Sequence, residues 1–287
     1  MTSIIKKELR AYFTSMIGYV FLAFLVFMTA LFFVVHNLLE ALPHYNLVLS
    51  NVGMIFMILI PMLTMRLFAE EAKQKTDQLL YTSPVSVMAV VLGKYAAALL
   101  LFLIGMGITV IFPVALAPFG ELPVAQITGA FVGAILLGAC FISVGLFVSV
   151  LADNQIVAAV AAFAALFLLT VLDAVIAVLP RDRVSSLFFV LFFAVLAAYL
   201  LYDSTKSAAA GILTALAGSG AAGTAYAFAP SAFDGLIMNA LGWFSLMARF
   251  GYFHMGILNA ADVVYYVSFI ALFLVFTIGV IEKRRWR

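Results

Sequence analysis

Charge is scarce in this sequence: only 10% of its 287 residues are Asp, Glu, Lys or Arg, whereas 67% are hydrophobic. Soluble globular domains have about 25% charged residues, so the composition excludes an ordinary soluble protein. The formal net charge of +2 is too small to indicate a nucleic-acid partner. We therefore expect an all-α polytopic membrane protein that forms a single transmembrane domain over residues 1–287.

Residue patterns that carry common chemistry are also missing. Cys140 is the single cysteine, which excludes an intrachain disulfide. The one Gly-Lys pair, Gly93-Lys94, fails the nucleotide-binding P-loop pattern because Met88 stands where the first glycine is needed. No H-E-x-x-H pattern occurs. The sequence gives no catalytic, cofactor-binding or metal-binding residue.

Long apolar stretches are present instead, and they predict about eight membrane-spanning helices, since one span needs about 20 apolar residues. The seventh stretch is rich in Gly and Ala. Without the sixth and seventh stretches, six spans would leave the chain ends on the same side, so six spans stay open as an alternative. The predicted spans are residues 16–35, 52–68, 95–117, 126–150, 156–179, 185–201, 207–228 and 262–281.

Basic residues predict the orientation, because cytoplasmic loops carry an excess of Lys and Arg. With the N-terminus inside, 12 basic residues fall on the cytosolic side and only Arg181, Arg183 and Arg249 fall outside. Both termini are therefore expected in the cytosol. The 12 are Lys6, Lys7, Arg10, Arg66, Lys73, Lys75, Lys94, Lys206, Lys283, Arg284, Arg285 and Arg287.

Two flanking segments are predicted to lie at the membrane surface. In residues 1–13, Ile5, Leu9, Tyr12 and Phe13 share one helical face, which favours an interfacial helix. Residues 229–261 are apolar but broken by glycines and a proline, which favours two short re-entrant helices that dip into the outer leaflet. An ordinary external loop is the alternative for this second segment.

Residues 66–94 form a polar island between the second and third spans. Arg66, Glu70, Lys73 and Asp77 recur at helical spacing, so the second span is expected to continue as a helix into the cytosol. That helix cannot run through Ser83-Pro84, because a proline disfavours helical geometry in the residue before it.

A new helix is expected to begin at this turn, with Ser83 as N-cap and Pro84 as its first residue. The tip of the resulting knob carries Leu79, Leu80 and Tyr81. Apolar residues at such a tip either bind a partner surface or fold back on the ends of the protein's own spans.

These residues resemble the first cytoplasmic loop of type-2 ATP-binding-cassette (ABC) permeases, above all the gliding-motility (Gld-type) subfamily. Residues 152–157 and the ending at 262–286 fit the same subfamily. The resemblance covers residues 1–179 and 241–287. In the polar island it rests on Arg66, Glu70-Glu71, Thr76-Asp77, Leu79-Leu80, Ser83-Pro84-Val85 and Leu92-Gly93-Lys94.

The resemblance implies a type-2 ABC permease fold with a six-span core and a cytosolic coupling helix. It implies a multi-pass protein of the bacterial cytoplasmic membrane, expected to work as an exporter. A separate cytosolic ATPase would bind ATP and Mg, and further partners would be a second permease chain (a homo- or heterodimer), membrane lipids and an auxiliary extracytoplasmic subunit. The implied ATPase-coupling residues are Glu70, Glu71, Thr76, Asp77, Leu79, Leu80, Tyr81, Ser83, Pro84 and Val85.

Two departures from the family pattern stand out. Lys75 occupies the place where the family has a glycine before Thr76. Residues 185–228, the extra helix pair, have no counterpart in the six-span core. Separately, Gly129 and Gly133 have a spacing that lets helices approach closely, either within the chain or at a dimer seam.

Other functions remain as alternatives. An ion-coupled secondary transporter would carry ionisable groups inside its spans, and Asp173 is the only acidic residue there. An intramembrane enzyme is disfavoured, because His36, His44 and His254 are predicted on the side opposite Glu70-Glu71. A membrane partner without transport activity is the last alternative.

Overall fold

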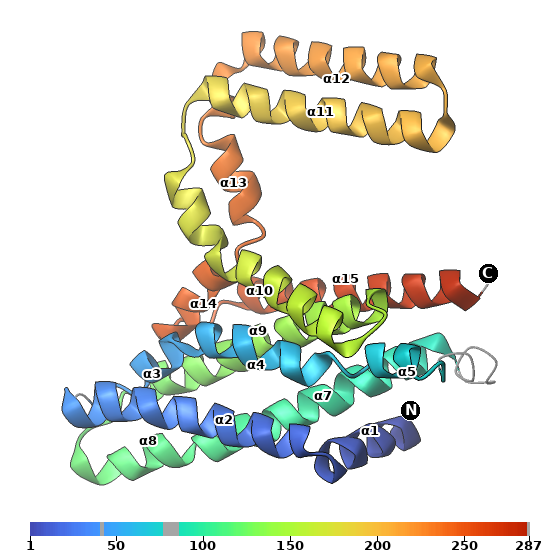
Figure 1. Cartoon of the computed structure of the whole chain (residues 1–287). Coiled ribbons are helices and arrows are strands. Elements are labelled where there is room, and N and C mark those ends of the chain that lie inside the picture. Colours follow the sequence, from blue (N-terminus) through green and yellow to red (C-terminus); the bar gives the residue numbers. More distant parts are fainter. Residues whose placement is uncertain (41–42, 77–85, 286–287) are drawn as a thin grey trace. The chain divides into compact units, whose positions relative to one another are not determined.

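The computed structural model describes residues 1–40, 43–76 and 86–285, and these residues form helices and loops without a strand (Figure 1). The α-helices are α1 (Thr2–Thr14), α2 (Met16–Phe33), α3 (Asn46–Ser50), α4 (Val52–Thr64), α5 (Ala69–Lys73), α7 (Val87–Thr109), α8 (Ile111–Leu116), α9 (Val124–Leu151), α10 (Gln155–Val178), α11 (Arg183–Thr205), α12 (Ala208–Phe228), α13 (Leu236–Gly242), α14 (Leu246–His254) and α15 (Ala260–Arg285). A π-helix covers Val34–Leu39, and 3₁₀-helices cover Ala117–Phe119 and Pro230–Phe233.

The chain divides into two compact units. The first unit contains Met1–Thr170 and Leu246–Arg287, and the second contains Val171–Ser245. Helix α10 therefore begins in the first unit and ends in the second.

Eight helical stretches of the described residues are long and apolar enough to cross a membrane, which confirms the expected multi-pass helical architecture. The first expected span is extended by the π-helix to Leu39, and the third begins at Val87 rather than at residue 95. The eight stretches are Met16–Leu39, Val52–Lys73, Val87–Phe119, Val124–Leu151, Gln155–Val178, Arg183–Thr205, Ala208–Phe228 and Ala260–Arg285.

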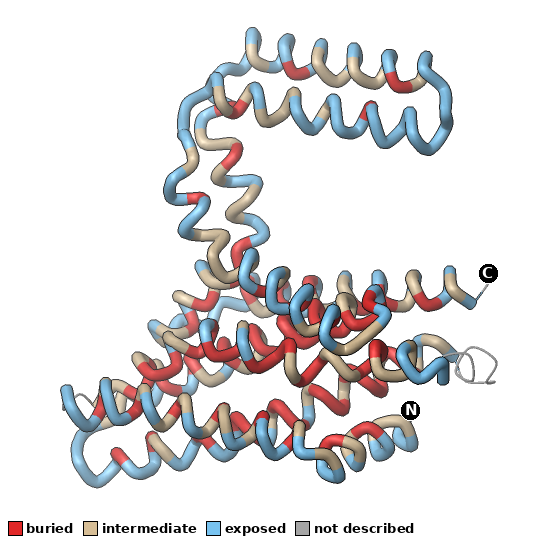
Figure 2. The backbone as a smooth tube through the Cα atoms, viewed as in Figure 1, coloured by how far each residue is buried: buried red, intermediate tan, exposed pale blue. Residues whose placement is uncertain are grey.

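Helix α9 is the centre of the first unit. Figure 2 shows buried residues concentrated on α4 and α9, where α2, α7, α14 and α15 surround them. Small residues of α9 let its neighbours approach: a Cβ at Gly138 would lie 2.2 Å from the Phe102 ring, and one at Gly145 would lie 2.3 Å from the Thr64 hydroxyl. The core therefore requires glycine at these positions of α9.

The Gly129 and Gly133 pair packs inside the chain. A Cβ at Gly133 would lie 2.5 Å from the Cβ of Phe253, and one at Gly129 would lie 2.6 Å from the Phe253 carbonyl oxygen. Helix α14 thus lies directly on these glycines. The two possibilities open at the sequence level, packing within the chain or a dimer seam, are resolved in favour of packing within the chain.

In the second unit, α11 and α12 form an antiparallel hairpin (Figure 1). Its helices meet where Gly211 faces Tyr202 and Gly218 faces Ala194. Asp182 caps α11 by accepting a hydrogen bond from the Ser185 backbone N–H (2.9 Å), and this bond lowers the pKa of the Asp182 carboxyl. The hairpin corresponds to the extra pair expected at residues 185–228.

Candidate functional site: an ion-pair network between α1, α5 and α7

The second span does not continue as an unbroken helix. Helix α4 ends at Thr64, a turn follows, and α5 begins at Ala69. The hydroxyl of Ser149, near the end of α9, accepts hydrogen bonds from the backbone N–H groups of Phe68 (3.1 Å) and Ala69 (3.2 Å). These bonds satisfy donors at the start of α5 and fix its position. The helical stretch therefore continues to Lys73, as expected, but is interrupted at residues 65–68.

Lys94 of α7 is the hub of the site. Its side chain is 2% exposed, and its Nζ lies 2.9 Å from Glu8 Oε1 of α1 and 3.0 Å from Glu71 Oε1 of α5. The same Nζ donates a hydrogen bond to the carbonyl oxygen of Leu67 and lies 5.0 Å from the centre of the Phe68 ring. One ammonium group therefore joins three elements that are far apart in sequence.

Lys7 adds a second cation to this network. Its Nζ donates to Glu71 Oε1 (3.1 Å), so the same carboxylate oxygen bridges Lys7 and Lys94. Burial lowers the pKa of Lys7, but the charge and hydrogen bond of Glu71 outweigh this effect and raise it overall. The other oxygen of Glu71 is buried without a hydrogen-bond partner among the described residues.

Arg66 forms the edge of the network toward α1. Its guanidinium donates to the Ser15 hydroxyl (2.8 Å), lies 3.3 Å from Glu70 Oε2, and stands 5.4 Å from the centre of the Tyr12 ring. Tyr12 is buried and donates its hydroxyl hydrogen to the carbonyl oxygen of Leu63 (2.8 Å). Burial raises the Tyr12 pKa, so the hydroxyl stays protonated as this donor.

The network balances its charges. Three carboxylates, those of Glu8, Glu70 and Glu71, face three cations, those of Lys7, Arg66 and Lys94. Burying ions is costly unless they are paired and hydrogen-bonded, which Lys94 and Glu8 are. The arrangement fixes three helices relative to one another but contains no nucleophile beside a base.

Helix α5 ends in a turn that requires unusual backbone geometry. Lys75 has φ of 56°, in the left-handed region that favours glycine. The Thr76 backbone N–H donates to the Glu71 carbonyl oxygen (3.0 Å) and closes the turn. Lys75 is the position where the resembled family has glycine, so this departure in sequence occurs at a site with a glycine-type conformation.

Only part of the predicted coupling site lies in described residues. Glu70 and Glu71 belong to the ion-pair network, and Thr76 closes the turn after α5. The remaining predicted residues lie outside the described residues; they are Asp77, Leu79, Leu80, Tyr81, Ser83, Pro84 and Val85.

The helix that enters the third span begins later than expected. Ser86 has an extended backbone (φ −66°, ψ 139°), and its side chain accepts a hydrogen bond from the Ala89 N–H (3.3 Å). Ser86 is therefore the N-cap of α7, which begins at Val87, whereas the expected start at Ser83-Pro84 lies outside the described residues. Another serine, three positions further on, supplies the expected capping chemistry.

Sequence reasoning missed the pairing of Glu8 with Lys94. The two residues are 86 positions apart, and each looks like a surface charge beside an apolar run. A signal was present nonetheless: Lys94 directly precedes a long apolar stretch, where a charge needs a partner. The sequence alone does not say which carboxylate supplies it.

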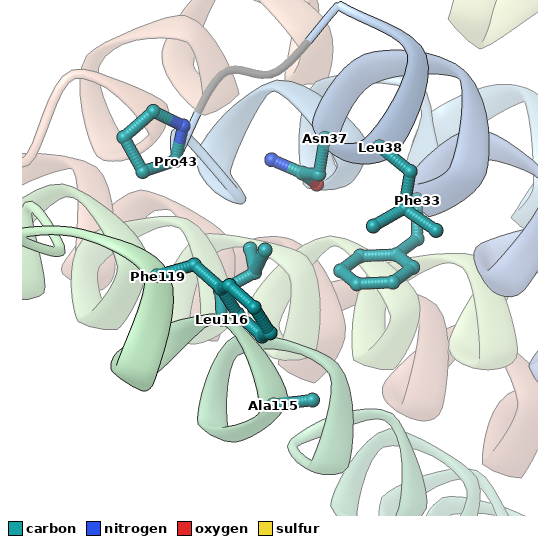
Figure 3. Close-up of a pocket in the computed structure, with 7 residues that line it drawn as sticks. All are labelled: Phe33, Asn37, Leu38, Pro43, Ala115, Leu116 and Phe119. Atoms are coloured by element: carbon teal, nitrogen blue, oxygen red, sulfur yellow. The ribbon is translucent and has the colours of Figure 1, made fainter.

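The opposite end of the first unit has a smaller polar cluster. Arg249 of α14 lies 2.7 Å from Asp262 Oδ1 of α15, and its guanidinium stands 3.9 Å from the centre of the Tyr265 ring. A cavity of about 380 Å³ lies at the same end, between the π-helix and α8 (Figure 3). Its lining is mainly apolar, with the Asn37 amide among the side chains that surround it, and none of its lining residues is charged.

Basic residues gather at the end of the first unit that holds the network. Helices α9 and α15 run in the same direction, because Cys140 contacts the Tyr266 carbonyl oxygen (3.5 Å) and, seven residues later in both helices, Phe147 packs on Phe273 (ring centres 5.7 Å apart). The end of α15 therefore lies near α5. Among the described residues, the opposite end has Arg249 as its only Lys or Arg. The basic residues at the network end are Lys6, Lys7, Arg10, Arg66, Lys73, Lys75, Lys94, Lys283, Arg284 and Arg285.

No cluster of three or more His, Cys, Asp or Glu side chains suited to a metal ion occurs in residues 1–40, 43–76 and 86–285. No known protein-family model matches the chain. A search of curated proteins likewise found no match. The class that the fold defines is a multi-pass helical membrane protein.

Proposed function

We propose that the chain is the transmembrane permease subunit of an ATP-driven transporter of the type-2 ABC class. In this proposal it moves its substrate outward across the bacterial cytoplasmic membrane, with both termini in the cytosol. A separate ATPase subunit binds ATP and Mg and supplies the energy, and a second permease chain completes the pathway. In this proposal the catalytic residues belong to the ATPase subunit.

The proposal rests on the ion pairs that connect the two helices flanking residues 77–85. Helix α5 leads into this segment and α7 leads out of it, and the Lys94 ammonium group pairs with Glu71 of α5. Glu8 pairs with the same ammonium group and so connects α1 to these two helices. A segment that passes force from an ATPase to two spans needs such fixed attachments on both sides.

Two further features support the proposal. Lys75 has a φ of 56°, a conformation that favours glycine, directly before the motif residues Thr76-Asp77. The network end also holds most of the basic residues of the first unit, as the cytosolic end of a membrane protein does.

The proposal divides the predicted coupling residues into two roles. Glu70 and Glu71 face Arg66 and Lys94, so they act as positioning residues for α5. The ATPase contact then falls to residues 77–85, above all to Leu79 and Leu80, whose apolar side chains need a partner surface.

The test is purification of the chain in mild detergent together with its bound proteins. We expect a co-purifying ATPase, and replacing Leu79 and Leu80 by Asp should release it and abolish stimulated ATP hydrolysis. The matched control replaces another leucine pair, Leu38 and Leu39, which lies at the opposite end of the first unit and is exposed. Transport in vesicles without any ATPase would instead favour the ion-coupled alternative.

A further inference from the structure

Helix α1 has an outer face that the bundle leaves uncovered. Its inner face is engaged, with Glu8 paired to Lys94 and Tyr12 bonded to Leu63. Lys6 and Arg10 follow one another at i and i+4 on the outer face, and both side chains are exposed. Among the described residues, neither has an acidic partner within ion-pair distance.

An aromatic residue on the same face of α1 contacts an exposed tyrosine at the start of α2. Phe13, one turn beyond Arg10, is 36% exposed and packs edge-on against Tyr19 of α2, with ring centres 5.9 Å apart. Tyr19 is 58% exposed at the start of the first apolar span. Exposed aromatic rings at the end of a span mark the level of the lipid headgroups.

The join between α1 and α2 holds α1 at this level. A single residue, Ser15, separates the two helices, and its backbone is extended (φ −99°, ψ 158°). A Cβ at Gly18 would lie 2.6 Å from the carbonyl oxygen of Tyr12, so the two helices meet closely. Helix α1, about 20 Å long, is therefore attached directly to the start of the first apolar span.

We propose that the outer face of α1 binds the headgroups of anionic phospholipids through Lys6 and Arg10. Two cations without an ion-pair partner in the described part of the chain, beside exposed aromatic rings, complement a negative phosphate surface. Basic residues near such a surface bind it electrostatically. The buried face of the same helix joins Lys94 and Glu71. Lipid binding on the outer face and the positioning of α5 through the inner face therefore both depend on helix α1.

The test is hydrogen–deuterium exchange of α1 in nanodiscs that contain either phosphatidylcholine alone or an equal mixture with phosphatidylglycerol. We expect α1 to exchange about tenfold more slowly with the anionic lipid. The difference should shrink at high salt, because salt screens exposed charges. No ATPase is needed, so the outcome is independent of the proposed function.

Charge variants assign the effect to this face. In the double variant Lys6→Gln/Arg10→Gln, the difference between the two lipids should disappear. The control Lys73→Gln/Lys283→Gln removes the same charge from exposed positions at the same end and should keep the difference. Equal exchange in both lipids, a persistent difference in the double variant, or its loss in the control would overturn the proposal. Protection of α1 that appears only when an ATPase is added would assign this face to a protein and would also overturn it.

Discussion

Each end of the first unit holds an ion pair with at least one buried member, but the two pairs differ in how far apart in sequence their residues lie. Arg249 and Asp262 are 13 positions apart and join the neighbouring helices α14 and α15. Lys94 and Glu8 are 86 positions apart, and Glu71 extends the same contact to a third element. The first pair fastens a local connection, whereas the second assembles the segments on both sides of residues 77–85.

Under the proposed function, this difference assigns force transmission to the network end. The Arg249–Asp262 pair lies next to the close packing of α14 on the glycines of α9. Packing as well as charge therefore stabilises this end of the first unit. The network end is held to a larger degree by charged groups with defined partners. These ion pairs attach α1, α5 and α7 to one another on both sides of residues 77–85.

The largest expected effect comes from removing the ammonium group of Lys94. Lys94→Met should destabilise the protein by about 3–5 kcal/mol, because the buried Glu8 would lose its nearest cation and Glu71 would keep only Lys7. The measurement is thermal unfolding in detergent. A combined Glu8→Gln/Lys94→Met variant should recover part of the loss. Equal stability of Lys94→Met and the native protein would show that the network does not hold the helices.

The pair at the other end should matter less. Arg249→Gln leaves Asp262, whose side chain is 5% exposed, without its cation, and we expect a loss of about 2–3 kcal/mol. Exchange measurements should place the disturbance in α14 and the start of α15. A disturbance that reaches α1 or α5 would contradict the distinction between the two ends.

The packing of α14 on α9 allows a sharper comparison. Gly133→Ala should cost about 1–3 kcal/mol, since its Cβ would lie 2.5 Å from the Phe253 Cβ. The matched control is Gly107→Ala in α7, where no atom lies within 4 Å of the added Cβ. The control should be neutral or stabilising by about 0.5–1 kcal/mol. Equal melting temperatures for the two variants would refute close packing at Gly133.

The smallest expected effect is at the turn after α5. Lys75→Gly should stabilise the turn by about 0.5–1 kcal/mol, because glycine adopts a φ of 56° without steric cost. Lys75→Val should be destabilising, since a β-branched residue is strained in this region. Thermal unfolding of the two variants gives the comparison. A more stable valine variant would show that the turn does not have this geometry in the membrane.

The membrane-spanning architecture was predictable because composition and length alone determine which stretches can cross a bilayer. The break between α4 and α5 was not, because the hydroxyl that stabilises it comes from Ser149 of α9. The partners of Gly129 and Gly133 were equally hidden, since their spacing indicates a close contact without naming the other helix. Within the candidate site, motif order located Glu70 and Glu71, but the contribution of Glu8 depends on how α1 folds back onto α7.

Photo-crosslinking from the two ends of the first unit tests the account most directly. A photoreactive residue in place of Leu80, at the proposed coupling segment, should crosslink to an ATP-hydrolysing subunit in native membranes. The same residue in place of Leu39, exposed at the opposite end, should not. A crosslink to an ATPase from position 80 alone is the predicted result. No ATPase crosslink from position 80, or one from position 39, would contradict the proposed coupling of this chain to an ATPase through the network end.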